Sequence, residues 1–148
     1  MPYAARILAL DVGKKRIGLA VSDALGISAQ GLPTFQRTRI REDLRQLAAV
    51  IRDRDISLLL VGNPLHMSGT ESRQAVYTRE FAERLRTETG VPVVYWDERL
   101  TTVEAERVLR EANATLAQRK KAVDRLAAVL LLESYLDSQR EAGGDDVA

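Results

Sequence analysis

Short apolar stretches at the start of the chain have the pattern of β-strands. Ile7–Leu10 and Ile17–Val21 are apolar runs with β-branched residues, and the turn-forming stretch 11–15 (DVGKK) separates them. This pattern predicts a β-hairpin. Gly31–Gln36 predicts a third strand, and Pro33 within it favours a position at the edge of a sheet.

Strands and helices alternate in the rest of the chain. The continuous apolar runs Ser57–Gly62 and Val91–Trp96 predict two buried strands. Helical periodicity predicts four helices. The first covers residues 39–54, and the second lies between a capping box at 68–71 (SGTE) and Gly90. The third follows a second capping box at 101–104 (TTVE), and the fourth covers residues 119–137. The inner faces of the first two helices consist of Ile40, Leu44, Leu47 and Ile51 and of Tyr77, Phe81 and Leu85. A meander followed by strand–helix crossovers implies an α/β fold, a mixed sheet flanked by helices.

Composition limits the possible chemistry. The 148 residues suit one domain, which we place at residues 1–138, followed by a flexible acidic tail at 139–148. The absence of cysteine excludes disulfides, iron–sulfur clusters, thiolate zinc sites and cysteine nucleophiles, and a single histidine, His66, excludes sites that need two. The longest apolar run, Leu126–Leu132, is too short to span a membrane, so we expect a cytoplasmic protein without a membrane partner.

The net charge of +1 hides an asymmetry. Residues 133–148 sum to −4, which leaves +5 for the rest of the chain, and 17 of the 21 basic residues in that part are arginine. Arginine suits forked contacts to phosphate. The balance permits a nucleic-acid partner, although a solvated charged surface explains it equally well.

Acidic residues stand out at three places: Asp11, the pair Asp97–Glu98, and Asp124. Each has a structural explanation by itself, as a turn former, a charge near a helix start, or a member of an ion pair. Asp11 and Glu98, however, follow predicted strands, where sites of open α/β sheets collect. Converging carboxylates without histidine or cysteine suit Mg²⁺ or Mn²⁺. Two such ions about 3.5–4 Å apart can activate a water and stabilise the leaving oxygen of a phosphodiester.

Five stretches, in order and spacing, resemble the YqgF family, also called RuvX, of RNase H-like nucleases. They are LALDVGKKRIGLAVSD (8–23), LLLVGNPLHMSGT (58–70), FAERL (81–85), DERLTTVEA (97–105) and KKAVDRLAAVLLLESYLD (120–137). The resemblance implies an RNase H-like fold, a mixed five-stranded sheet with helices on both faces. It also implies metal-dependent hydrolysis of a nucleic-acid backbone; the family is assigned to pre-16S rRNA and was once grouped with Holliday-junction resolvases.

The family motifs imply a catalytic set of carboxylates that hold the metal: Asp11, Glu98 and Asp124. Asp97 is the rival of Glu98, since adjacent residues of an extended segment point to opposite faces. RNase H-like resolvases generally carry their second acid after the strand that corresponds to Ser57–Gly62. This chain has Asn63-Pro64 at that place and therefore no acid. The YqgF family shares this lack of an acid.

Basic residues near these acids are candidates for nucleic-acid binding: Lys14, Arg16, Arg99, Lys120 and Lys121. Lys14 and Arg16 equally fit an exposed turn, and Arg99 fits a partner that orients Glu98. His66 fits a proton shuttle or a surface residue of its loop. Tyr95 and Trp96 fit base stacking, but their place at the end of a buried strand favours core packing.

We therefore expect a metal-dependent nuclease that hydrolyses RNA in the 5′-end maturation of pre-16S rRNA, with RNA or a pre-ribosomal particle as its partner. One alternative is a junction resolvase acting on branched DNA, which requires a two-fold dimer. The sequence shows no apolar seam for one, so we expect a monomer or a weak homodimer. A second alternative is a noncatalytic nucleic-acid-binding module. The turn 11–18 (DVGKKRIG) also suits a nucleotide kinase, but those proteins pair two such domains.

Overall fold

A computed structural model describes residues 6–63, 73–97, 115 and 126–140 of the chain. Its strands are β1 (Ile7–Val12), β2 (Arg16–Ser22), β3 (Ala29–Gln36), β4 (Leu58–Gly62) and β5 (Val93–Trp96). Its labelled helices are α1 (Ile40–Asp53) and α2 (Arg73–Thr89), and residues 126–140 are also helical.

The described strands form one mixed sheet in the order β3-β2-β1-β4-β5. β2 is antiparallel to both β1 and β3, whereas β4 is parallel to β1 and β5 is parallel to β4. The first three strands are therefore a meander, and the last two join it through helical crossovers. This arrangement confirms the predicted hairpin, the predicted third strand at a sheet edge and the mixed five-stranded sheet.

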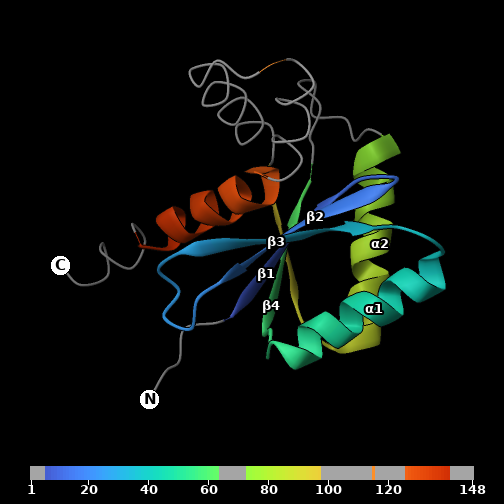
Figure 1. The fold of residues 1–148 in the computed structure, drawn as a ribbon, viewed down its shortest axis with the longest axis horizontal. Helices are drawn as coiled ribbons and strands as arrows, with labels where there is room; N and C mark the ends of the chain where they lie inside the picture. Colours follow the sequence, from blue (N-terminus) through green and yellow to red (C-terminus); the bar gives the residue numbers. More distant parts are fainter. Residues whose placement is uncertain (1–5, 64–72, 98–114, 116–125, 141–148) are drawn as a thin grey trace.

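Helices cover both faces of the sheet (Figure 1). Alternation along β1 sends Leu8 and Leu10 into the core under α1 and α2, while Ile7 and Ala9 pack under the helix of residues 126–140. The central strands β1 and β4 are buried on both faces for this reason, as their continuous apolar sequences predict.

The apolar stripes of α1 and α2 fill the larger core. Leu44, Leu47, Ile51, Phe81 and Leu85 are buried there, and Ile40 and Tyr77 pack against it. These are the seven residues that the helical periodicity predicts for the two inner faces. Burial of each such side chain contributes about 1.5–3 kcal/mol relative to leaving it in water.

The helix of residues 126–140 packs closely on the opposite face. Ala127 and Ala128 are buried, and a Cβ added to Gly31 of β3 would lie 3.2 Å from Cγ2 of Val129. Small side chains at this contact allow the helix and the sheet to approach each other. Trp96 joins β5 to the same helix, since its indole nitrogen donates a hydrogen bond of 3.1 Å to the hydroxyl of Ser134.

Some boundaries differ from the sequence-based expectation. β5 begins at Val93 rather than Val91 because Pro92 has no N–H to give to a ladder, although its carbonyl accepts from Leu59. The residues of β5 are half-buried rather than buried, because β4 is the only neighbour of β5 in the described sheet. The last helix continues to residue 140, three residues beyond the predicted end at 137.

Other predicted features are confirmed or lie elsewhere. Gly90 has a φ of +73°, the left-handed conformation expected of a residue that ends a helix. The capping boxes at 68–71 and 101–104 and the helix predicted after the second one lie outside the described residues. In the ranges listed above, no helix is both long and apolar enough to cross a membrane.

Candidate active site at the carboxyl edge of the sheet

The carboxyl ends of β1, β4 and β5 meet at one edge of the sheet because these three strands are parallel. Asp11 is the second-last residue of β1, and Asn63 and Asp97 directly follow β4 and β5. The backbone N–H of Asn63 donates a hydrogen bond of 2.8 Å to the carbonyl of Trp96, which keeps the ends of the last two strands together. The first predicted acid thus lies at the edge where ligand sites of this fold class form.

Asp11 lies on the face of the sheet that carries the helix of residues 126–140. Side chains alternate along a strand, and Ile7 and Ala9, which share the phase of Asp11, pack against that helix. Leu10 and Val12 take the opposite face and are buried under α1 and α2. Asp11 itself is only partly buried, so its carboxylate is accessible at the end of an otherwise apolar strand.

Alternation along β5 bears on the choice between Asp97 and Glu98. Trp96 packs in the cluster of residues 126–140, and Tyr95 packs in the cluster on the other face. Trp96 therefore shares the face of Asp11, and alternation assigns Asp97, the next residue, to the opposite face. Glu98 lies outside the described residues.

A tight turn joins β1 to β2 directly after Asp11. The N–H of Gly13 donates to the carbonyl of Arg16 over 2.9 Å, and a Cβ added to Gly13 would lie 2.7 Å from that same oxygen. No side chain fits there, so the tight hairpin depends on glycine at position 13. Residues 14–16 (KKR) are exposed at the tip.

A hollow of about 320 Å³ lies between this hairpin and β3. Its lining consists of Asp11, Gly13, Lys14, Lys15, Arg16, Gly18 and Thr34. A lining that combines one carboxylate with three cationic side chains makes the hollow suitable for an anion such as a phosphate that approaches a metal-binding group. The structure thereby brings together three of the predicted site residues, Asp11, Lys14 and Arg16.

The other predicted site residues lie outside the described part of the chain: Glu98, Arg99, Lys120, Lys121 and Asp124, together with His66. Over residues 6–63, 73–97, 115 and 126–140, no group of three or more His, Cys, Asp or Glu side chains is placed to hold a metal ion. The described part thus shows one member of the predicted carboxylate set, Asp11.

Sequence reasoning missed two residues that line the hollow, Lys15 and Thr34. Lys15 continues the basic run of the turn, and that run was the signal that could have included it. Thr34 has no such signal, because it reaches the hollow only through the pairing of β3 with β2. Sequence reasoning also missed Arg37 and Gln74, which hold the hairpin from behind.

Tyr95 and Trp96 use their polar atoms inside the fold. The hydroxyl of Tyr95 donates to the carboxylate of Glu83 over 2.9 Å. Burial, followed by this bond to an anion, raises the pKa of Tyr95 to about 12. The ring of Trp96 meets Tyr135 edge-to-face, with the centroids 5.3 Å apart. These contacts favour the packing interpretation over base stacking.

Comparison with known proteins identifies the family. The family profile described as "RuvX: Holliday junction resolvase" matches residues 5–138. A protein of Koribacter versatilis named "Putative pre-16S rRNA nuclease" is 53% identical over 132 residues, covering 89% of this chain and 86% of its own. A protein of Thermoanaerobacter pseudethanolicus with the same name is 46% identical over 136 residues, covering 91% and 98%.

Two solved structures show the same fold at low sequence identity. The Thermus thermophilus RuvC structure in complex with a Holliday junction superposes with a TM-score of 0.58 at 14% identity, covering 90% of this chain and 97% of RuvC. The fowlpox virus resolvase in complex with junction DNA gives a TM-score of 0.53 at 11% identity, covering 90% and 98%. The RNase H-like α/β fold predicted from the motifs is confirmed. Because the family profile matches most of its length and its relatives are this similar, the chain belongs to the RuvX family, which is the YqgF family that its sequence motifs resemble.

Proposed function

We propose that this protein is a divalent-metal-dependent nuclease that hydrolyses phosphodiester bonds of pre-16S rRNA during 5′-end maturation in the cytoplasm. The observation that carries the proposal is the partly buried carboxylate of Asp11 at the carboxyl end of a central strand, in a hollow that three cationic side chains also line. The names of the relatives, all over 40% identical, support rRNA as the substrate.

The ligands we propose for the metal are Asp11, Glu98 and Asp124. Asp11 offers the hard carboxylate oxygens that Mg²⁺ and Mn²⁺ prefer, and it is only partly buried. The phase of β5 supports Glu98 over Asp97, since Glu98 is two residues past Trp96 and Trp96 shares the face of Asp11. When bound there, a pair of ions supplies the activation of a water and the stabilisation of the leaving oxygen.

Distances along the last helix support Asp124 as the third ligand. Val129 packs on Gly31, which lies in register with Ala9 across β2. Asp11 is two strand residues from Ala9, about 6.6 Å toward the carboxyl edge. In the sequence, Asp124 precedes Val129 by five residues, which is about 7.5 Å in a helix such as the one predicted over residues 119–137. This similar spacing supports Asp124 as a ligand beside Asp11.

The direction and phase of that helix agree with this proposal. Arg140 at its far end donates to the carbonyl of Ile27 in the turn between β2 and β3, which lies at the amino edge of β1. Its earlier residues therefore run toward the carboxyl edge. In the sequence, Asp124 precedes the buried Ala128 and Leu131 by four and seven residues, which is the spacing of one helix face and supports this choice of ligand.

The basic residues of the hairpin act on the substrate backbone in this proposal. Lys14 and Arg16 take the phosphates beside the scissile bond, and Arg99, Lys120 and Lys121 extend this contact. Such contacts hold the strand in register over Asp11 without reading its sequence. We place these residues in one domain, 1–138, with the acidic segment 139–148 outside the binding surface, and we expect a monomer or a weak homodimer.

A cleavage assay with charge-neutral, shape-matched variants tests the proposal. Wild-type protein and the variants D11N, E98Q and D124N are incubated with a labelled pre-16S rRNA fragment in Mg²⁺, Mn²⁺ or EDTA. We expect metal-dependent cleavage that each variant lowers by about 100-fold or more, because each removes a ligand charge. Cleavage that persists in EDTA, or in all three variants, contradicts the proposed site.

Asp97 provides the matched control for Glu98. We expect D97N to cleave within about threefold of the wild-type rate, because alternation keeps Asp97 off the face of Asp11. If D97N loses most of the cleavage rate and E98Q loses little, then Asp97 rather than Glu98 is the metal ligand. The rest of the carboxylate proposal then stands on D11N and D124N.

The similarity to junction-bound resolvases favours a second candidate function, cleavage of branched DNA. A four-way DNA junction and an unstructured RNA belong in the same assay. Paired cuts in the junction at a higher rate than cuts in the rRNA fragment put the resolvase function first. That outcome also requires a two-fold dimer in solution, which sedimentation measures.

A further inference from the structure

A charged pair is buried behind the hairpin. The side chains of Arg37 and Asp43 are 7% and 1% exposed, and Nε of Arg37 lies 3.2 Å from Oδ2 of Asp43. Removing two charges from water is unfavourable unless their hydrogen bonds are well satisfied. The pair is therefore not an ordinary surface salt bridge, and its hydrogen bonds indicate what it does.

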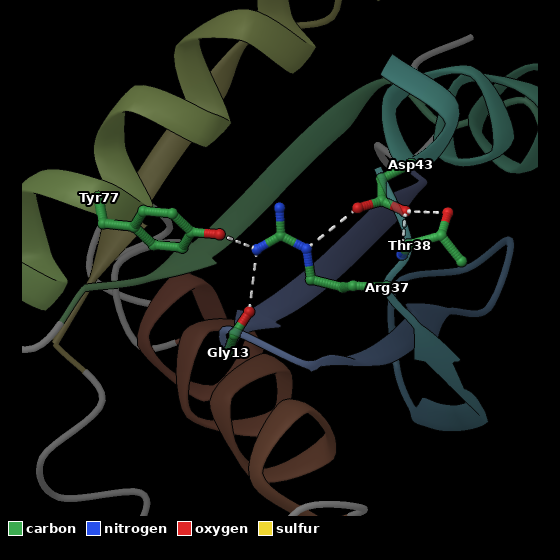
Figure 2. Close-up of polar contacts among 5 residues, drawn as sticks. All are labelled: Gly13, Arg37, Thr38, Asp43 and Tyr77. Atoms are coloured by element: carbon green, nitrogen blue, oxygen red, sulfur yellow. Dashed lines mark hydrogen bonds and ion pairs between the residues drawn. The ribbon is translucent and has the colours of Figure 1, made fainter. Parts of the chain in front are cut away.

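The guanidinium of Arg37 joins three parts of the fold (Figure 2). Besides Asp43 of α1, it donates from Nη1 to the carbonyl of Gly13 over 3.0 Å and to the hydroxyl of Tyr77 on α2. It also lies 4.7 Å from the ring centroid of Phe81 and 5.4 Å from that of Tyr77. A planar fork with several donors suits this arrangement, and the single ammonium of a lysine does not.

Two more hydrogen bonds reach the hairpin from the same side. The backbone N–H of Arg37 donates to the carbonyl of Lys15 over 2.9 Å, and the amide of Gln74 on α2 donates to the carbonyl of Val12 over 3.0 Å. The carbonyls of Val12 and Gly13 are thus held by side chains, and the carbonyl of Lys15 is held by the backbone that follows β3. In a trans peptide the N–H points opposite to the carbonyl, so the N–H of Lys14 points away from Arg37.

Arg37 does not face a nucleic-acid backbone in this arrangement, because its side chain is buried and its Nε and Nη1 groups donate within the protein. The hairpin that it holds has the opposite character, with Lys14, Lys15 and Arg16 exposed directly after Asp11. The contacts of Arg37 therefore control the orientation of the groups that do face the hollow.

We propose that Arg37 is a positioning residue: through the Gly13 carbonyl it fixes the β1–β2 hairpin, and thereby the place at which Asp11 and the basic tip meet a nucleic-acid backbone. The part about nucleic acid rests on the proposed function. The part about the hairpin rests on the contacts alone.

The test uses the double variant R37M/D43N in the full chain. Methionine keeps most of the packing between the rings of Tyr77 and Phe81, but it donates nothing to Gly13. Asparagine keeps an oxygen for the N–H of Thr38, which now donates to Oδ1 of Asp43 over 2.9 Å. Removing both charges together also avoids leaving one of them buried without a partner.

The matched control is R45M/E42Q, which removes an exposed ion pair from the same helix. Amide hydrogen exchange measured by NMR gives the first readout, because the N–H groups of Gly13 and of position 37 both donate to carbonyls of the hairpin. The kcat and KM of metal-dependent RNA cleavage give the second. Thermal unfolding of each variant checks that the fold is retained.

We expect the amides of Gly13 and position 37 to exchange at least about tenfold faster in R37M/D43N, while amides of the central strand β4 keep their protection. We expect kcat to fall by about tenfold or more, since small displacements of positioning groups have effects of this size. R45M/E42Q should match the wild type in both readouts. Unchanged exchange at Gly13 overturns the proposal, and so does faster exchange with unchanged kcat.

A second variant keeps the test decisive where R37M/D43N does not fold. R37K keeps the charge beside Asp43 but has no fork that reaches Gly13 at the same time. We expect the same faster exchange and lower kcat, and wild-type values in R37K overturn the proposal. A wild-type protein that cleaves no substrate refutes the proposed function instead, and the exchange readout then still decides whether Arg37 holds the hairpin.

Discussion

Gly13 determines the shape of the turn beside Asp11, because the carbonyl of Arg16 occupies the space where a side chain would begin. We expect G13A to lower the free energy of unfolding by about 1–3 kcal/mol, since the 2.7 Å approach forces the turn to open. Urea unfolding measures this loss. We also expect G13A to lower the rate of RNA cleavage, because the turn carries Lys14 and Arg16.

Gly90 is the control for this substitution. G90A places alanine at a φ of +73° but in open space, far from the proposed site. It should destabilise the protein by about 1 kcal/mol through backbone strain and leave cleavage unchanged. Equal losses of cleavage in both variants would show that the effect follows stability and not the shape of the turn.

Single residues differ in how far the sequence reveals their roles. Asp11 and Gly13 belong to one contiguous motif, so their roles in the turn follow from local chemistry. Arg37 belongs to no motif, because its partners Gly13 and Tyr77 are far from it in the chain and meet it only after the sheet and helices have packed. An isolated arginine between a strand and a helix has the same sequence pattern as a solvated surface charge.

A hydrogen bond from the Tyr95 hydroxyl to the Glu83 carboxylate joins β5 to α2. Burial and the bond to Glu83 raise the pKa of Tyr95 from 10.0 to about 12. The hydrogen bonds that Glu83 accepts, first from Tyr95 and then from Arg86, lower the pKa of Glu83. A raised tyrosine pKa means that this contribution to stability is fully present below pH 10. It is lost as the pH rises from 10 to about 12.

We therefore expect Y95F to be less stable than the wild type by about 1 kcal/mol at neutral pH, and to lose less stability between pH 10 and 12. Urea unfolding of both proteins at pH 8 and pH 11 measures the difference. E83Q, which keeps an oxygen to accept the bond, separates the hydrogen bond from the charge. Identical alkaline losses in Y95F and wild type would contradict the assignment.

At the scale of elements, periodicity predicts which residues of α1 and α2 face inward because one apolar stripe per helix must be buried. The ends of elements were less accurate. Pro92 shortened β5, and the pairing of Arg140 with Asp137 accompanies a longer last helix. Both depend on single backbone or side-chain groups that an apolar pattern does not describe.

The whole molecule carries 22 basic and 21 acidic residues, so its average charge gives little attraction to nucleic acid. Affinity should depend on the local concentration of cations at the hairpin. We expect a variant with Lys14, Lys15 and Arg16 all changed to glutamine to bind single-stranded RNA more weakly. The slope of log K against log salt should become shallower by up to about 2, since each lost phosphate contact accounts for about 0.7.

A control with the same change in net charge removes three exposed arginines of α1, namely Arg41, Arg45 and Arg52. Its RNA affinity and salt slope should stay near the wild-type values, because α1 covers the other face of the sheet. Fluorescence anisotropy of a labelled RNA measures both. Similar losses in the two triple variants would show that total charge, rather than the hairpin, governs binding.

The fold class follows from the order of predicted elements, a meander and then crossovers, which only a mixed sheet accommodates. The order of the strands in space needs more than this. β1 lies between β2 and β4 because both of its faces are apolar, but no local pattern states which later strand joins its free edge. The residues of the candidate site are dispersed along the chain for the same reason, so only the hairpin part of the site was predictable as one unit.

The strand order also has a consequence for synthesis on the ribosome. β2 has both of its neighbours once Gln36 has been translated, whereas β1 obtains its second neighbour only with Leu58–Gly62. At roughly 5–20 residues per second, the nascent chain carries an open apolar strand edge for about one to four seconds. Such an edge can pair with other chains. The strand that bears Asp11 is thus open to mispairing until β4 has been made.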